Sequence, residues 1–438
     1  MSFRRALGPF DATMVVVGGI IGSGIFILPS LVAQRLPTPA LVLAAWVAGG
    51  AVALSGAFSF AELATLFPRA GGEYTYLKEA YHPIVAFLFG WASLAMIQGG
   101  GLAAVAITFA QYALRLLSRE PAGASAWAAV AIAAVAVVNF AGVKPGSRLL
   151  NVLVILKVLA LAALIFGGLL LPHPSPAASG SPPAPRAGIL SFGAALVPIL
   201  FAYGGWQSVN LIAEETRDPR RTLPLALTLG TLIVIAVYLL TNVVLLSVLS
   251  RPGLASTATP AADAARLLFG GRSDRLVSAA IAVSAFGFLD LTLMAQTRIY
   301  YAMGRDGLFF RGLARLHPRF QTPSAAIVLQ AAWGILLVLT GTYGELVDSV
   351  VFGDWIFFGL TVAGVFVFRR RLPLESREPG SFRTPGYPWL PALFIVAAAL
   401  AVWSAVRTNP ARSALGAGLL LSGVPVYLLF ARRRPQAA

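Results

Sequence analysis

The segment GGIIGSGIF, from Gly18 to Phe26, places four glycines and a serine inside an apolar run long enough to cross a membrane. In hydrocarbon, an unpaired backbone amide or carbonyl costs several kcal/mol, so non-helical backbone persists only where protein or a cavity surrounds it. A break at Gly22, Ser23 and Gly24 leaves free amides at the start of the following half-helix, which also carries the positive end of the helix dipole. The segment therefore predicts an interrupted helix whose amides bind a carboxylate.

A second glycine pair, Gly204 and Gly205, interrupts another apolar run at FAYGGWQSVN. The half-helices that end near Ile20 in the first run and at Phe201 to Gly204 in the second present free carbonyls, which suit an ammonium group. An amide cradle beside a cluster of carbonyls fits a zwitterion without any charged side chain. The alternative for either glycine cluster alone is close helix packing through small residues.

The composition is that of a polytopic membrane protein. Of 438 residues, 58% are hydrophobic and 11% are charged, with a mean hydropathy of +0.80. The net charge of +16 comes from Lys and Arg scattered in short loops, which indicates anionic lipid and membrane topology rather than nucleic acid. The absence of cysteine excludes disulfides, thiolate metal sites and a disulfide-linked partner subunit.

The reactive side chains of an enzyme are scarce in this chain. No nucleotide-binding motif supports an ATP-driven pump. With no Cys and no His inside the apolar runs, few side chains could serve as a nucleophile, a base or a set of metal ligands. His82, His173 and His317 all fall in connecting segments, so no metal or other cofactor is expected. We therefore expect a membrane protein that is not an enzyme.

Windows of about 20 apolar residues predict a series of membrane-spanning helices. With both termini in the cytoplasm, most of the 33 Lys and Arg residues fall on the cytoplasmic side, as the positive-inside rule requires. The Pro/Ser/Ala-rich segment 172–189 is then an external loop. The chain is expected to be a multi-pass protein of the cell membrane. The twelve expected spans are 11–34, 41–67, 84–116, 124–142, 149–171, 190–213, 223–250, 275–303, 323–341, 345–368, 388–406 and 413–431.

The two glycine breaks fall in the first and sixth expected spans, five helices apart. Because a half with five spans crosses the membrane an odd number of times, the second half (190–371) runs in the opposite direction to the first half (1–171). Paired breaks in inverted halves are typical of secondary transporters that hold their substrate at the breaks. Residues 372–438 add two further helices and a cytoplasmic tail.

Three ionisable residues lie deep within expected spans, namely Lys157, Asp290 and Asp354. Charged side chains at such depth are costly and mark functional sites by default. Lys157 lies about 13 Å into the fifth span, and the alternative role for it is an ion pair that pins two helices together. Each of the two acids is a candidate proton carrier or salt-bridge partner. We expect structural pairing for Asp290 and leave the role of Asp354 open.

Acidic residues near the ends of the spans are expected at the cytoplasmic surface. Glu62, Glu214 and Glu215 are expected to form gate salt bridges or loop contacts, the last two beside the basic residues of 217–221. Glu73 is expected on a solvated face of its segment.

Several motifs, in order along the chain, resemble those of the amino acid–polyamine–organocation superfamily, and most closely its L-type amino acid transporter family with its bacterial relatives. The similarity runs from about residue 10 to 430. It implies a leucine-transporter-like fold of two inverted five-helix repeats plus two helices. It also implies alternating access, as an exchanger or a proton-coupled carrier that needs no sodium. The motifs are GGIIGSGIF, SFAELATLFPRAGGEYTYLKEAY from Ser59, FAYGGWQSVNLIAEETRDPRRTLPLAL from Phe201, and RIYYAMGRDGLFF from Arg298.

The resemblance also implies roles for individual positions at the breaks. The amides of Ser23 and Gly24 would contact the substrate carboxylate. The carbonyls of Ile20, Phe201 and Gly204 would accept hydrogen bonds from its amino group. Phe201 would in addition act as a gate over the substrate.

In the tenth expected span, VFGDWIFFGL resembles the family segment that lines the side-chain pocket, which nominates Phe352 and Trp355. A lysine at the position of Lys157 is implied to replace, by its charge, a sodium ion bridging the first and eighth helices. Two departures bear on substrate choice. Gln207 stands where family members often carry Asn, and Asp354 precedes the pocket tryptophan where an uncharged residue is common.

These features together predict a sodium-independent secondary transporter of L-amino acids, of the neutral class, that works as an exchanger. One alternative is a proton-coupled amino acid symporter. An alternative of another class is a transporter-like channel or an amino acid sensor, because both can reuse the same fold.

Overall fold

The computed structural model describes residues 3–119, 123–172, 188–271, 273–341, 343–372 and 380–432, without the side chains of 274 and 343–352. Most of the expected external loop, 173–187, therefore lies outside the described residues. The described chain is helical, with an isolated parallel bridge between Leu7 and Thr216.

The helices are α1 (Pro9–Ile20), α2 (Gly24–Arg35), α3 (Pro39–Leu66), α4 (Glu73–Ala80), α5 (Pro83–Ala92), η1 (Ser93–Ile97), α6 (Gln98–Leu116), α7 (Ala124–Phe140), α8 (Val143–Leu170), α9 (Ile189–Ala202), α10 (Ser208–Leu211), η3 (Ala213–Glu215), α11 (Pro219–Ser256), α12 (Pro260–Phe269), α13 (Ser273–Leu291), η4 (Thr292–Gln296), α14 (Thr297–Arg305), η5 (Arg311–Ala314), α15 (Ser324–Thr340), α16 (Tyr343–Arg371), α17 (Trp389–Thr408), α18 (Pro410–Leu421) and α19 (Gly423–Arg432).

Local signals divide the apolar sequence into helices with defined ends. Proline opens α1, α3 and α5, at positions where the missing amide hydrogen would have no partner in the helix. Thr38 caps α3 by accepting a hydrogen bond from the amide of Leu41, at 3.2 Å. The helix boundaries therefore follow from short-range chemistry before any packing is considered.

Each of the twelve expected spans overlaps a helix of the described chain. By length and composition alone, seven helices in the described residues can cross a membrane, or eight if α1 and α2 form one bent span. Shorter apolar helices, α7, α9 and α15, accompany them. The chain is therefore an all-helical, multi-pass membrane protein.

Both glycine clusters interrupt their helices, as predicted. α1 ends at Ile20 and α2 begins at Gly24, with a bend of 43° between them. α9 ends at Ala202, and α10 begins only at Ser208 after a run of turns. The sequence did not predict that the third and eighth expected spans also depart from α-helix, through the π-helical turns η1 and η4. Such turns are frequent at functional sites.

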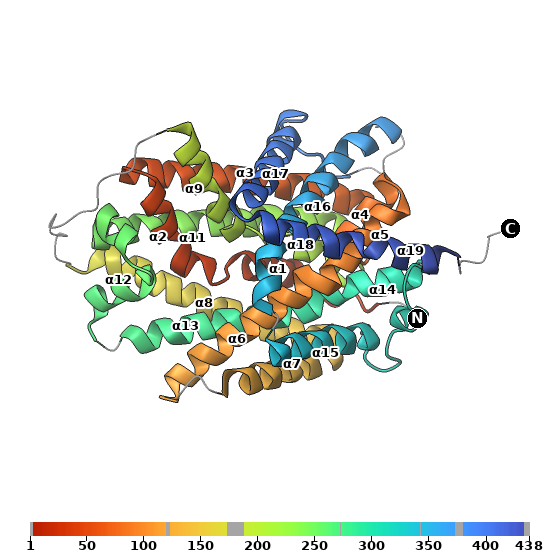
Figure 1. Cartoon of the computed structure of the whole chain (residues 1–438), viewed down its shortest axis with the longest axis horizontal. Coiled ribbons are helices and arrows are strands. Elements are labelled where there is room, and N and C mark those ends of the chain that lie inside the picture. Colours follow the sequence, from red (N-terminus) through yellow and green to blue (C-terminus); the bar gives the residue numbers. More distant parts are fainter. Residues whose placement is uncertain are drawn as a thin grey trace.

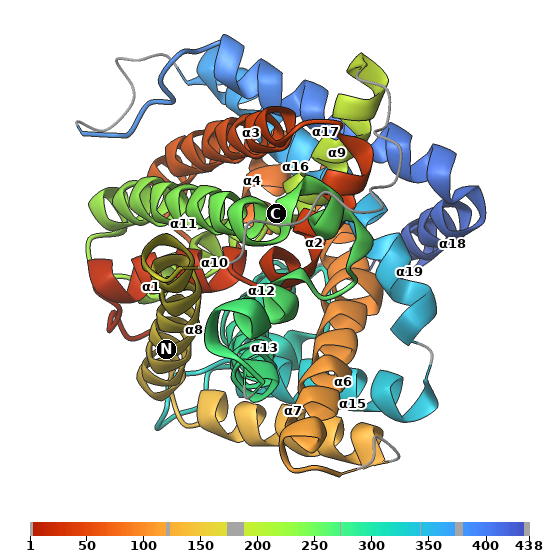
Figure 2. The same ribbon diagram turned by 90° about the vertical axis from the view of Figure 1, so that its left-hand side faces the viewer.

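The helices pack side by side in one bundle. Figure 1 shows α7 and α15 along one edge, with α3 and α9 toward the opposite edge. Figure 2, turned by 90°, shows α13 beside α6, α7 and α8, and these helices are in contact. The first described residues and α19 lie at the same end of the molecule (Figure 1). The breaks in α1–α2 and α9–α10 are thereby enclosed by other helices rather than exposed at an edge.

Candidate functional site

A cavity of about 220 Å³ lies where the two breaks meet, and we call it the central cavity. Its walls come from both breaks, from η1 and η4, and from α6, α13 and α16. The sequence therefore selected residues from distant segments that the fold brings to one cavity. The predicted residues that line it are Ile20, Gly22, Ser23, Gly24, Phe201, Gly204, Gly205, Gln207, Asp354 and Trp355.

The backbones of the two breaks touch each other through glycine. A Cβ placed on Gly205 would come closer than 3.0 Å to the carbonyl group of Gly19, and one placed on Gly19 would meet the carbonyl oxygen of Gly205. Gly205 also has φ +110°, a conformation that residues with a side chain rarely adopt. Glycine is therefore required at both positions by space, and at Gly205 by backbone conformation as well.

Lys157 on α8 binds the end of α1 directly. Its Nζ donates hydrogen bonds to the carbonyl oxygens of Gly18, at 2.8 Å, and of Ile21. The side chain has 0% exposure. Ser284 on α13 donates to the same Ile21 carbonyl, at 3.3 Å. The ammonium group thus supplies positive charge at the negative end of a broken helix, where the last carbonyls have no partner in the helix itself.

Tyr238 on α11 joins the two breaks, a role that was not predicted from the sequence. Its hydroxyl lies 2.9 Å from the carbonyl oxygen of Ile20 and 3.2 Å from that of Ala202, and donates its single hydrogen to one of them at a time. The amide of Gly22 also donates to Ile20, at 2.8 Å. The Ile20 carbonyl therefore already has donors on the protein side, which leaves it fewer lone pairs for a substrate ammonium.

The start of α2 carries the amides expected to meet a carboxylate. Because the amide of Gly22 is used within the break, the free donors are those at the first positions of α2, from Ser23 and Gly24 onward. A Cβ at Gly22 would meet nothing within 4 Å, whereas one at Gly24 would lie 3.1 Å from Leu28 Cδ1. The cavity thus reaches the backbone of the break at Gly22.

The second break contributes Phe201, Gly204 and Gln207 to the cavity wall. Phe201 is 51% exposed, as a side chain at the mouth of a cavity would be. Its carbonyl accepts from the amide of Gly204, at 3.1 Å. The Gln207 side chain accepts from the amide of Gly205, at 2.9 Å, so it stabilises the turn locally.

α16 forms one wall of the central cavity with Asp354 and Trp355. Trp355 is 6% exposed, and the centroid of its ring lies 5.8 Å from the ring centroids of Phe358 and Phe394. This packing fixes the position of its indole. Phe352 lies on the same helix, and its side chain is outside the described residues.

Asp290 on α13 lies away from the central cavity lining and is fully buried. The side-chain amide of Asn139, on α7, donates to its Oδ1 at 2.6 Å. The pairing of Asp290 within the described chain is thus with a neutral amide rather than with Lys157. Asn139 is a partner that sequence reasoning did not name.

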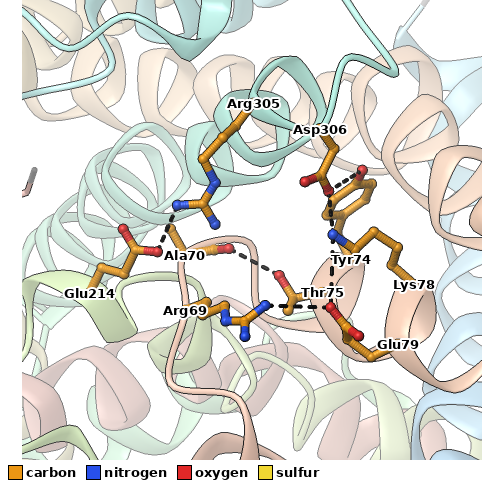
Figure 3. A network of polar contacts seen from close by, with 9 residues as sticks. All are labelled: Arg69, Ala70, Tyr74, Thr75, Lys78, Glu79, Glu214, Arg305 and Asp306. Carbon is orange, nitrogen blue, oxygen red and sulfur yellow. Dashed lines mark hydrogen bonds and ion pairs between the residues drawn. The ribbon is translucent and has the colours of Figure 1, made fainter. Parts of the chain in front are cut away.

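A second, polar cavity of about 360 Å³ lies at the end of the bundle that carries α4, η3 and the end of α14; we call it the charged cavity. Figure 3 shows Arg305 directed toward Glu214 and Lys78 toward Asp306, with N–O distances of 2.9 and 2.8 Å. Exposed pairs of this kind each contribute little to stability. The residues lining the charged cavity are Arg69, Thr75, Lys78, Glu214, Arg305 and Asp306.

Glu215 and Glu62 form ion pairs with arginines that the sequence did not name as their partners. Glu215 does not pair with the basic residues of 217–221 but with Arg298, which reaches both of its oxygens at 2.8 and 2.9 Å. Glu62 is bound in the same way by Arg369, at 2.7 and 2.9 Å. Both pairs join segments far apart in the sequence, so removing one partner would leave a buried charge uncompensated.

A multi-pass bundle with a small-molecule cavity between two broken helices defines a membrane transporter rather than an enzyme. The model of the family described as amino acid permease matches residues 7–430. The chain is 31% identical to the serine/threonine exchanger SteT of Bacillus subtilis over 436 residues, covering 98% of each protein. It is 32% identical to the human b(0,+)-type amino acid transporter 1, covering 98% of this chain and 88% of that protein. It is 30% identical to the human cystine/glutamate transporter, covering 98% of this chain and 86% of that protein. The chain therefore belongs to the amino acid permease family of the amino acid–polyamine–organocation superfamily.

Proposed function

We propose that this chain is a sodium-independent exchanger of neutral L-amino acids in the cell membrane, working by alternating access. The observation that carries the proposal is the bond from the Lys157 ammonium to the Gly18 and Ile21 carbonyls at the end of α1. An ammonium group held there by the chain itself removes the need for a bound metal cation to neutralise the helix end. Exchange is favoured because a relative of similar length, SteT, is named as an exchanger.

The proposed topology has twelve spans, with both termini in the cytoplasm. Residues 1–171 and 190–371 form two inverted repeats of five helices each, 172–189 is an external loop, and 372–438 hold the last two helices and the tail. The π-helical turns support this arrangement, since η1 and η4 lie five spans apart, like the two breaks. In this orientation the charged cavity faces the cytoplasm.

The proposed substrate site is the central cavity. The amides of Ser23 and Gly24 bind the carboxylate of the substrate, and the carbonyls at the second break, at Phe201 and Gly204, bind its ammonium group. Gly22 and Gly205 keep the backbone accessible, and Phe201 closes over the bound molecule. The cavity, at about 220 Å³, is smaller than the sites of drug-sized ligands, which supports a substrate of amino-acid size.

We expect exchange to proceed at an unchanged rate when sodium is replaced by potassium or choline on both sides of the membrane. The reason is that the side chain of Lys157, rather than a sodium ion, meets the carbonyls at the α1 end. The measurement is uptake of radiolabelled amino acids into proteoliposomes, with and without unlabelled amino acid inside. Stimulation by internal substrate distinguishes an exchanger from a channel or a sensor. A strict sodium requirement would contradict the proposed role of Lys157.

We expect Trp355→Ala to change which amino acids compete for uptake more than it changes recognition of the shared carboxylate and amine. The indole packs beside the cavity, whereas the carboxylate and amine are assigned to backbone groups of the breaks. Competition by a panel of neutral amino acids tests this. An equal loss of affinity for every amino acid would exclude Trp355 as a side-chain contact.

The proton-coupled symporter remains the second candidate because Asp354, an acid, lines the central cavity. Accumulation of substrate driven by an inward proton gradient, without internal amino acid, would favour it over exchange.

A further inference from the structure

Glu73, the first residue of α4, is buried although the sequence predicted a solvated position for it. The side chain has 4% exposure, and its Oε1 has no hydrogen-bond partner in the described part of the chain. The hydroxyl of Tyr76, one turn later, is likewise buried and unpartnered among those residues. A charged carboxylate in such a place loses its hydration without compensation, so the neutral acid is favoured.

The position of Glu73 is between the two cavities. Thr75 and Lys78, on the same short helix, line the charged cavity. On the other side, the negative charge of Asp354, which lines the central cavity, acts on Glu73. Asn210 on α10 follows the second helix break, touches the adjacent Gly72 region, and has both amide atoms buried without partners in the described chain. Buried polar groups without partners among the described residues thus gather around the start of α4.

The cations near α4 are engaged by other acids. On α14, Arg298 binds Glu215 and Arg305 binds Glu214; Asp306, directly after α14, binds Lys78 of α4. On α16, Arg369 binds Glu62. α5 contains no charged residue. Among the described residues, the charged side chain that acts on the Glu73 carboxylate is therefore that of Asp354, which has the same sign.

Burial raises the pKa of Glu73 well above its ordinary value, and the negative charge of Asp354 raises it further. A metal cation would need several oxygen ligands at this point. The described residues hold no group of three or more His, Asp or Glu suited to a metal. A proton is the cation that a single unpartnered carboxylate can bind.

We propose that Glu73, with Asp354 beside it, is a proton-binding site on the path between the central cavity and the cytoplasm. The proton sits on the Glu73 carboxylate while the cytoplasmic half of the path is closed and Glu73 is buried. It leaves to cytoplasmic water when that half opens and Glu73 becomes hydrated. During amino acid exchange, Glu73 binds a proton again in the return step, so protons do not accumulate on either side of the membrane. The transport step of this inference rests on the proposed function. The protonation of Glu73 does not depend on it.

The test compares wild type with Glu73→Gln, which keeps the size of the side chain and cannot ionise. Exchange of a radiolabelled neutral amino acid is measured without sodium, at equal pH on both sides, between about pH 5 and pH 9. Above the pKa of Glu73 the wild-type rate should fall about tenfold per pH unit. The rate of Glu73→Gln should not change over the same range. Glu79→Gln, which changes a partly exposed acid of the same helix, is the matched control and should follow the wild-type pH profile.

A second measurement does not depend on transport. Because the pKa of Glu73 is raised in the folded protein, the stability it contributes is complete below the unfolded pKa and is lost as pH rises through the folded pKa. The melting temperature of purified wild-type protein should therefore fall across that window, and that of Glu73→Gln should fall less.

If Glu73→Gln does not fold, Asp354→Asn takes its place: removing the neighbouring negative charge should move the falling part of both profiles to lower pH. The proposal would be overturned if the folded variant showed the same pH dependence as wild type in both its exchange rate and its melting temperature. Absence of transport in wild type would reject the proposed function, while the melting profiles would still decide the proton site.

Discussion

Lys157→Ala should lower exchange turnover by at least about 100-fold while the protein still reaches the membrane. The substitution removes the hydrogen bonds to the Gly18 and Ile21 carbonyls, at the end of a helix that has no other donors of equal charge. The Gly18 carbonyl loses this donor, whereas the Ile21 carbonyl keeps the hydroxyl of Ser284. An unpaired buried acceptor costs about 1–3 kcal/mol, and loss of the positive charge at the helix end adds to this cost. About 1.4 kcal/mol corresponds to a factor of ten in rate. The measurement is exchange in proteoliposomes at matched amounts of inserted protein.

Lys144→Ala is the matched control, because Lys144 lies on the same helix and also binds α1. Its Nζ is 2.6 Å from Asp11, whose carboxylate keeps the hydroxyl of Ser147 and the amide of Asn151 as donors. We expect a much smaller loss than for Lys157→Ala. Lys157→Arg should retain part of the activity because guanidinium keeps the charge but not the shape. Normal turnover of Lys157→Ala would remove this lysine from the mechanism.

Gly205→Ala should remove most exchange activity by adding a single methyl group. That methyl would overlap the carbonyl of Gly19 and would sit on a backbone with φ +110°. Strained backbone costs about 1–3 kcal/mol, and overpacking a close contact costs about as much. We expect exchange below about a tenth of wild type and a melting temperature lower by roughly 2–6 °C.

Gly193→Ala is the control for this substitution, because Gly193 lies on α9, in the same expected span. A Cβ there would meet nothing within 4 Å, so the variant should keep its transport and its stability. Both proteins are compared by exchange and by thermal melting in detergent. Wild-type activity of Gly205→Ala would show that the contact between the breaks is not maintained during transport.

The breaks and the part of the cavity lining that lies on or next to them could be predicted because their signal is local. Glycines such as Gly22 and Gly205 inside an apolar run conflict with a continuous helix wherever they occur, and the conflict is visible without knowing the fold. Lys157 is visible for the same reason, since a lone charge in an apolar run must find a partner. What the sequence could not supply was the identity of that partner, the carbonyls of Gly18 and Ile21.

The features that were missed depend on segments meeting in space. Tyr238 resembles any other aromatic residue of an apolar helix, and its bond to Ile20 arises only when α11 packs across both breaks. Glu73 lies in a polar stretch that is typical of a surface helix, yet neighbouring helices cover it. Arg298 and Glu215 are 83 residues apart, so no local spacing links them. Burial and ion pairing of this kind follow from tertiary packing rather than from sequence pattern.

The contact between Gly19 and Gly205 makes the two breaks a fulcrum. With backbone against backbone and no side chain between them, the half-helices can tilt about this point while the contact is kept. α2 has 12 residues and is therefore about 18 Å long, so a tilt of roughly 20° moves its far end by about 6 Å while Gly24 hardly moves. Short levers on a common fulcrum convert small rearrangements beside the bound molecule into large displacements at the membrane surface.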